Sequence, residues 1–211
     1  MLANTQELVF AAALGVCCGL AGTRFARHYT RKIQSESPSG VGITACCISW
    51  CVLALLTTGV NFGWFAVSCI GAMLITASAI DLKVLLLPDV LTLPAAALSI
   101  PVSIFLIGNS PEFALYGALA GSGFFYIIAA IYEKIRKRSG LGMGDVKLLV
   151  SLGAFTGPSG IFYAITFGSM LLLLWSIPQL LFSKQRASRM QTALPYGPFL
   201  CLGAMSVFML Q

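Results

Sequence analysis

Two aspartates, Asp81 and Asp145, are the residues of this sequence best placed to do chemistry. Each lies at the edge of an apolar segment, where an ionisable side chain is costly to keep and is a functional candidate. Asp81 follows its segment and Asp145 opens a later one, so the dipoles of the two helices act on them with opposite sign. Two such carboxylates can share a proton, one activating a water molecule while the other protonates a scissile carbonyl.

A plainer interpretation is that both aspartates only mark helix ends and face water or lipid headgroups. Chemistry is favoured by a G-x-G-D motif, formed by Gly142, Gly144 and Asp145, because its glycines let the backbone approach another helix or a substrate closely. The only histidine, His28, lies in a basic segment, and no serine or cysteine has a base at a suitable position. Asp89 precedes an apolar segment, where we expect it to cap the helix or to hydrogen-bond between loops.

The elements that position these residues are membrane spans. The 211 residues are 58% hydrophobic and only 9% charged, which is too little charge to cover a water-soluble surface. Apolar runs near the roughly 20 residues needed to cross a bilayer recur along the chain. We therefore predict an all-α transmembrane bundle, a single domain over residues 1–211, with about eight spans: 5–23, 41–58, 62–80, 90–107, 112–132, 145–157, 160–182 and 195–210.

The basic residues fix the orientation of this bundle. All 13 Lys and Arg residues fall in segments on one side of the predicted map, including the short loop 24–40, and the connections on the other side carry none. The positive-inside rule then places both termini on the non-cytoplasmic side. Orientation in the lipid bilayer accounts for the net charge of +6 without a nucleic-acid partner. The seven cysteines form no C-x-x-C pair, so we expect no metal and no cofactor.

The sequence resembles the type IV prepilin peptidases, a family of aspartic proteases of the bacterial inner membrane. The resemblance implies that Asp81 and Asp145 are the catalytic pair, with Gly142, Gly144 and Asp89 in supporting positions. It also implies that a short basic leader is removed from type IV prepilins or pseudopilins, after a glycine at the cytoplasmic face, just ahead of a hydrophobic helix. It rests on three blocks in order: Ile-Asp-Leu-Lys-Val-Leu-Leu-Leu-Pro-Asp-Val-Leu-Thr-Leu-Pro at 80–94, Gly-Leu-Gly-Met-Gly-Asp-Val-Lys-Leu-Leu at 140–149 and Pro-Tyr-Gly-Pro-Phe-Leu at 195–200.

One departure from that family concerns the region between the first two spans. Longer members have a cytoplasmic domain there with two C-x-x-C pairs, and they also methylate the new N-terminus using S-adenosylmethionine. Here the region is loop 24–40, which contains no cysteine, so we expect cleavage without zinc or methylation. A bifunctional peptidase and N-methyltransferase is one alternative. Others are a small ion-coupled transporter or channel that uses the same aspartates, and a catalytically silent assembly factor.

Overall fold

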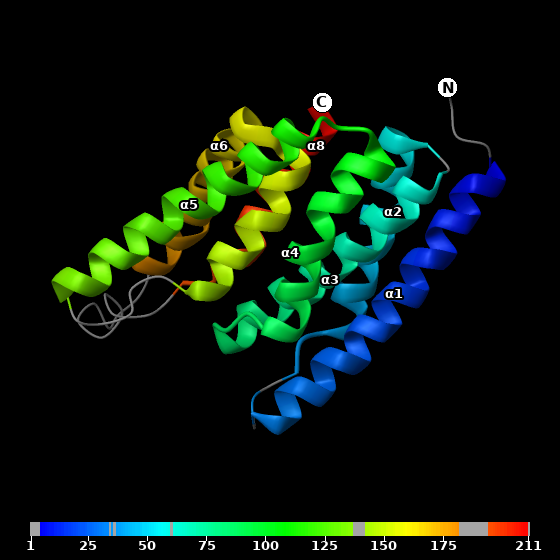
Figure 1. The fold of residues 1–211 in the computed structure, drawn as a ribbon. Helices are drawn as coiled ribbons and strands as arrows, with labels where there is room; N and C mark the ends of the chain where they lie inside the picture. Colours follow the sequence, from blue (N-terminus) through cyan, green and yellow to red (C-terminus); the bar gives the residue numbers. More distant parts are fainter. Residues whose placement is uncertain are drawn as a thin grey trace.

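The chain is all-helical in the part that the structure, a computed structural model, describes: residues 5–33, 35, 37–59, 61–136, 142–181 and 194–210. This confirms the predicted all-α class for those residues, which contain no strand. In chain order the elements are α1 (Thr5–Lys32), α2 (Gly40–Thr58), α3 (Phe62–Val84), α4 (Asp89–Pro101), the π-helix η1 (Val102–Ile107), α5 (Pro111–Arg136), α6 (Met143–Leu181) and α8 (Gly197–Leu210) (Figure 1).

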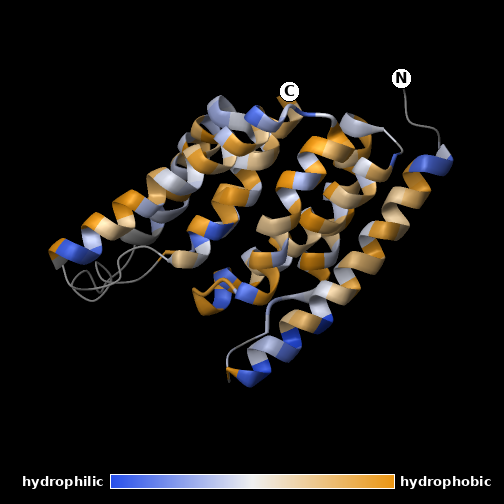
Figure 2. Cartoon of the chain, in the orientation of Figure 1, coloured by the Kyte–Doolittle hydropathy of each residue, from blue (hydrophilic) through white to orange (hydrophobic). Residues whose placement is uncertain are grey.

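Six helices are long and apolar enough to cross a membrane, namely α1, α2, α3, α4 with η1, α5 and α6. α8 is also apolar but shorter. Figure 2 shows hydrophobic residues along the length of the helices and hydrophilic residues mainly near their ends. The chain is therefore a multi-pass membrane protein. The count of about eight spans, and the placement of both termini on the non-cytoplasmic side, remain predictions.

Helix α3 lies at the centre of the bundle. It packs against α1, α2, α4, η1 and α8, and 61% of its most apolar stretch is buried, against 22–28% in the other five long helices. Its start is capped by Asn61, whose side-chain oxygen accepts a hydrogen bond from the Trp64 N–H at 2.7 Å. Its end is closed by Leu85, which adopts a left-handed conformation at φ 55°. Both caps hold α3 at a fixed length.

Helix α6 consists of two helices joined at a kink. Gly157 has φ 72° and ψ 178°, a conformation almost restricted to glycine, and Pro158 follows it. This is where the sequence predicts the break between two spans. A Cβ at Gly121 of α5 would meet both Leu149 and Ile161, one from each side of the kink, so the chain turns back there. Both ends of α6 consequently lie toward the same end of the bundle (Figure 1).

The prediction of a loop over 24–40 is wrong for its first part, because α1 continues to Lys32. Thr23, Ala26 and Thr30 recur at helical spacing and are buried, so this stretch packs as the last two turns of a helix. Arg31 and Lys32 lie in the last turn, where cations interact favourably with the helix dipole. Clustered basic residues are therefore compatible with a helix that continues beyond its apolar region.

Candidate functional site

Asp81 lies in the last turn of α3, and its side chain is held by the start of α8. The residue is only 6% exposed. Its Oδ2 atom accepts a hydrogen bond from the backbone N–H of Gly197 at 3.1 Å. Gly197 is the first residue of α8, so the positive end of that helix dipole also faces the carboxylate. The sequence alone placed Asp81 only at the C-terminal end of its own helix and did not reveal this donor.

Asp145 lies in the first turn of α6 and is partly buried. Its backbone N–H donates to the carbonyl of Gly142 at 3.0 Å. Its carboxylate interacts electrostatically with that of Asp81. The structure thus brings together two aspartates that come from opposite ends of two different helices. Figure 1 shows the turn between α3 and α4, the start of α6 and the end of α1 toward the same end of the bundle.

Leu87 lies against the starts of α6 and α8. It is 8% exposed. A Cβ added at Gly144 would lie 2.6 Å from the Leu87 Cβ, and one added at Gly197 would lie 3.1 Å from Asp81 Oδ2 and 3.4 Å from Leu87 Cδ2. A larger residue would collide with Leu87 at position 144, whereas at position 197 its Cβ would make a tight contact with Asp81. The two glycines therefore let α6 and α8 begin close to Leu87 and Asp81.

Asp89 does not cap α4, contrary to one of the two expected roles. The N-cap position is occupied by Pro88, and Asp89 is the first residue of the helix. Its Oδ1 instead forms an ion pair with Lys147 Nζ at 2.6 Å, a contact between the starts of two helices, where we expected a hydrogen bond between loops. Because Lys147 is two residues beyond Asp145, this pair ties the start of α4 to the first turns of α6. Lys147 is 58 residues from Asp89 in sequence, which is why the sequence could not identify it as the partner of Asp89.

Two further residues near the carboxylates were missed by the sequence reasoning. Tyr196 lies just before α8, and its hydroxyl is 2.7 Å from Ser169 Oγ. Cys201 lies one turn into α8, with its Sγ 3.2 Å from Ser78 Oγ. It interacts electrostatically with both aspartates. The only sequence signal for Tyr196 was its place in the block 195–200.

The chemistry available to this site is that of two neighbouring carboxylic groups. Among the described residues, no group of three or more His, Cys, Asp or Glu side chains could hold a metal ion. Two carboxylates so close together disfavour double ionisation, because like charges repel in a partly buried site. Such a pair can hold one proton between its two groups, which allows it to act as acid and base at once.

Comparison with known proteins gives consistent matches. Residues 68–177 match the model of the type IV leader peptidase family. A prepilin leader peptidase/N-methyltransferase of Xanthomonas campestris pv. campestris is 35% identical over 161 residues, which cover 75% of this chain and 54% of the relative. Proteins of the same name from Burkholderia pseudomallei strain 1026b and Escherichia coli strain K12 are 34% and 32% identical, over 63% and 74% of this chain and 42% and 66% of the relatives. The chain thus spans about half the length of the first two relatives. No solved structure matches it.

Proposed function

Because this chain belongs to the type IV leader peptidase family, we propose that it removes the leader peptide from type IV prepilins or pseudopilins, with Asp81 and Asp145 as its catalytic pair. The observation that carries this proposal is that the two carboxylates, which come from the end of α3 and the start of α6, lie within electrostatic range of each other. The names of the relatives support the substrate class. The residues form a single peptidase domain over 1–211.

The proposed reaction is hydrolysis of a peptide bond by a water molecule held between the two aspartates. One carboxylate takes a proton from the water as its oxygen attacks the scissile carbonyl carbon. The protonated partner gives its proton to the carbonyl oxygen, which forms a neutral tetrahedral intermediate. Collapse of that intermediate breaks the C–N bond, and a proton passes to the leaving amine. The pair titrates as one unit, so the charged state belongs to both residues rather than to either alone.

We place the cleavage at the cytoplasmic face of the bacterial inner membrane. Lys83 and Lys147 are each two residues from a catalytic aspartate, and the positive-inside rule favours the cytoplasmic side for them. The end of α1, with Arg31 and Lys32 in its last turn, lies toward the same end of the bundle (Figure 1). A leader that remains in the cytoplasm, joined to a helix in the bilayer, would present its scissile bond at this depth.

We further propose that this chain cleaves but does not methylate. Its relatives are named as both leader peptidase and N-methyltransferase. In this chain α1 ends at Lys32 and α2 begins at Gly40, so the connection between them is too short to hold a separate domain. It also contains no cysteine for a zinc site. The mass of the processed product tests this point, because methylation would add about 14 Da to a cleaved pilin.

The proposed function is tested by co-expressing the chain with a type IV prepilin and following the mass of the substrate. We expect removal of the leader by the natural sequence, and its complete retention with Asp81→Asn or Asp145→Asn. Asp89→Asn is the matched control, since it removes a carboxylate from the same end of the bundle without touching the pair. That variant should keep measurable cleavage. Normal processing by either of the first two variants, with correct membrane insertion, would contradict the catalytic assignment.

A further inference from the structure

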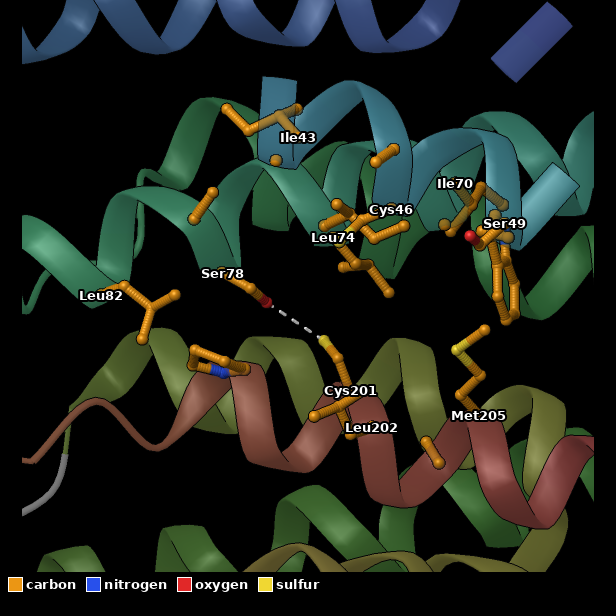
Figure 3. Close-up of a pocket in the computed structure, with 18 of the residues that line it drawn as sticks. Ile43, Cys46, Ser49, Ile70, Leu74, Ser78, Leu82, Cys201, Leu202 and Met205 are labelled. Atoms are coloured by element: carbon orange, nitrogen blue, oxygen red, sulfur yellow. Dashed lines mark hydrogen bonds between the residues drawn. The ribbon is translucent and has the colours of Figure 1, made fainter. Parts of the chain in front are cut away.

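A long apolar groove lies beside the aspartate pair. Its volume is about 890 Å³, and most of its lining comes from α2, α3 and α8. α2 and α8 each pack against α3, so the face of α3 between them forms the floor of the groove. Figure 3 shows Cys46 and Ser49 of α2 and Leu74 and Ser78 of α3 on one side of this space, facing Cys201 of α8 on the other. We name it the α2–α8 groove.

The dimensions of the α2–α8 groove fit one face of a membrane helix. The residues of α3 that line it extend from Val67 to Lys83, which corresponds to about 24 Å at 1.5 Å per residue. That is most of the roughly 30 Å thickness of the hydrocarbon core. A helix lying there would keep its other face toward lipid.

The wall contributed by α2 is built of small residues. Gly42, Ala45, Cys46 and Ser49 recur at positions i, i+3, i+4 and i+7, line the groove, and are all exposed. Small side chains at this spacing let a second helix approach closely, which is how helices associate in a bilayer. Because these residues are exposed, they are not needed to fill the core of the bundle. They therefore leave room for a partner from outside it.

The groove runs up to the neighbours of Asp81, although neither aspartate is among its lining residues. Ser78 and Leu82 line it and flank Asp81 along α3. On the opposite wall, Pro198 follows Gly197, the residue whose N–H donates to Asp81, and Cys201 interacts electrostatically with both carboxylates. An apolar segment lying in the groove would have the end of its chain beside the two aspartates. This position favours a peptide over a lipid as the occupant, because a lipid would bring no bond for the carboxylates to act on.

We propose that the α2–α8 groove is the binding site for the apolar helix of the substrate that follows the leader, and that it holds the scissile bond at Asp81 and Asp145. The inference rests on the proposed function. Leu74 and Asp81 are seven residues apart on α3, or about 10 Å, and Cys46 lies beside Leu74 on the same side of the groove (Figure 3). The substrate residue opposite Cys46 is therefore about seven positions beyond the cleaved bond.

Disulfide cross-linking tests this register, because Cys46 and Cys17 are the two exposed cysteines of the chain and only Cys46 lines the groove. Single cysteines are placed along the apolar segment of a co-expressed prepilin, and the full chain carries Asp145→Asn to keep the substrate intact. Every variant in this experiment also carries Cys201→Ser, because Cys201 lines the groove from α8. With Cys17→Ser, cross-links should be strongest near the seventh position and recur every three to four residues. With Cys46→Ser, which leaves Cys17 on α1 as the control, these cross-links should disappear.

A second measurement uses cleavage by chains in which the groove is filled. Ala45→Trp and Ser49→Trp should lower kcat/KM by about tenfold or more through a higher KM, since they remove binding shared by the ground and transition states. Ala13→Trp, at an exposed alanine of α1 outside the groove, should not. Three outcomes would refute the groove as the substrate site and leave the peptidase function standing. They are normal cleavage by the filled variants, Cys46 cross-links between two copies of the chain, and cross-links that persist with Cys46→Ser. A substrate that cross-links in register but is never cleaved would refute the function alone.

Discussion

Gly144 gives the sharpest test of how the site is packed. A Cβ at this position would lie 2.6 Å from the Cβ of Leu87, whereas ordinary contacts begin at 3.4 Å. In Gly144→Ala the start of α6 and the turn that carries Leu87 must therefore separate by about 0.8 Å, the difference between these two distances. Overpacking of this kind costs about 1–3 kcal/mol of stability. Since Asp145 is the next residue, it moves with the backbone, and a misplacement near 1 Å can cost about 100-fold in rate.

Prepilin cleavage and thermal unfolding in detergent measure these two effects. Gly123→Ala in α5 is the control, because a Cβ there would meet nothing within 4 Å. It should keep full activity and gain up to about 1 kcal/mol from the higher helix propensity of alanine. Adding Leu87→Ala to Gly144→Ala should not restore cleavage, since alanine keeps the Cβ atom that causes the collision. Full activity of Gly144→Ala, or its rescue by Leu87→Ala, would refute this account of the packing.

Two other predictions concern the elements that support the site. Either Asp89→Lys or Lys147→Asp alone should lower stability by about 0.2–1 kcal/mol, because the pair is partly exposed, and the double charge reversal should recover most of that loss in a thermal unfolding cycle. Gly157→Ala should lower stability by more than about 3 kcal/mol, because it combines a backbone conformation nearly restricted to glycine with a Cβ that would collide with the Phe113 ring. Membrane extracts should then contain little folded protein, and a yield near that of the natural sequence would contradict the role of the kink.

The parts of the fold that depend on local pattern were readable from the sequence. Apolar runs of span length predicted the helices, and Gly157 with Pro158 marked the break within α6. The predicted end of the first span is too early, because basic residues alone do not mark a loop. Ala26 and Thr30 are four residues apart and lie on one buried face of α1, and this spacing is the helical signal.

The parts of the site that depend on tertiary contact were not readable. The sequence identified Asp81 and Asp145 as candidates but could not supply the Gly197 N–H, which is 116 residues from Asp81. It gave Asp89 two roles and could not choose between them, because the deciding partner is Lys147. Leu87 carries no chemical signal at all, since its importance lies in the space that two glycines leave around it.

The hydrogen bond between Asp81 and Gly197 has a consequence for the order in which the protein is made. A ribosome completes α3 and α6 before it reaches α8, so a partly synthesised chain contains both aspartates but lacks the backbone donor that holds the first of them. The hydrogen bond that holds this carboxylate can form only once α8 has docked against α3. We therefore expect the proposed peptidase activity to appear after α8 has docked, later than the synthesis of the two aspartates themselves.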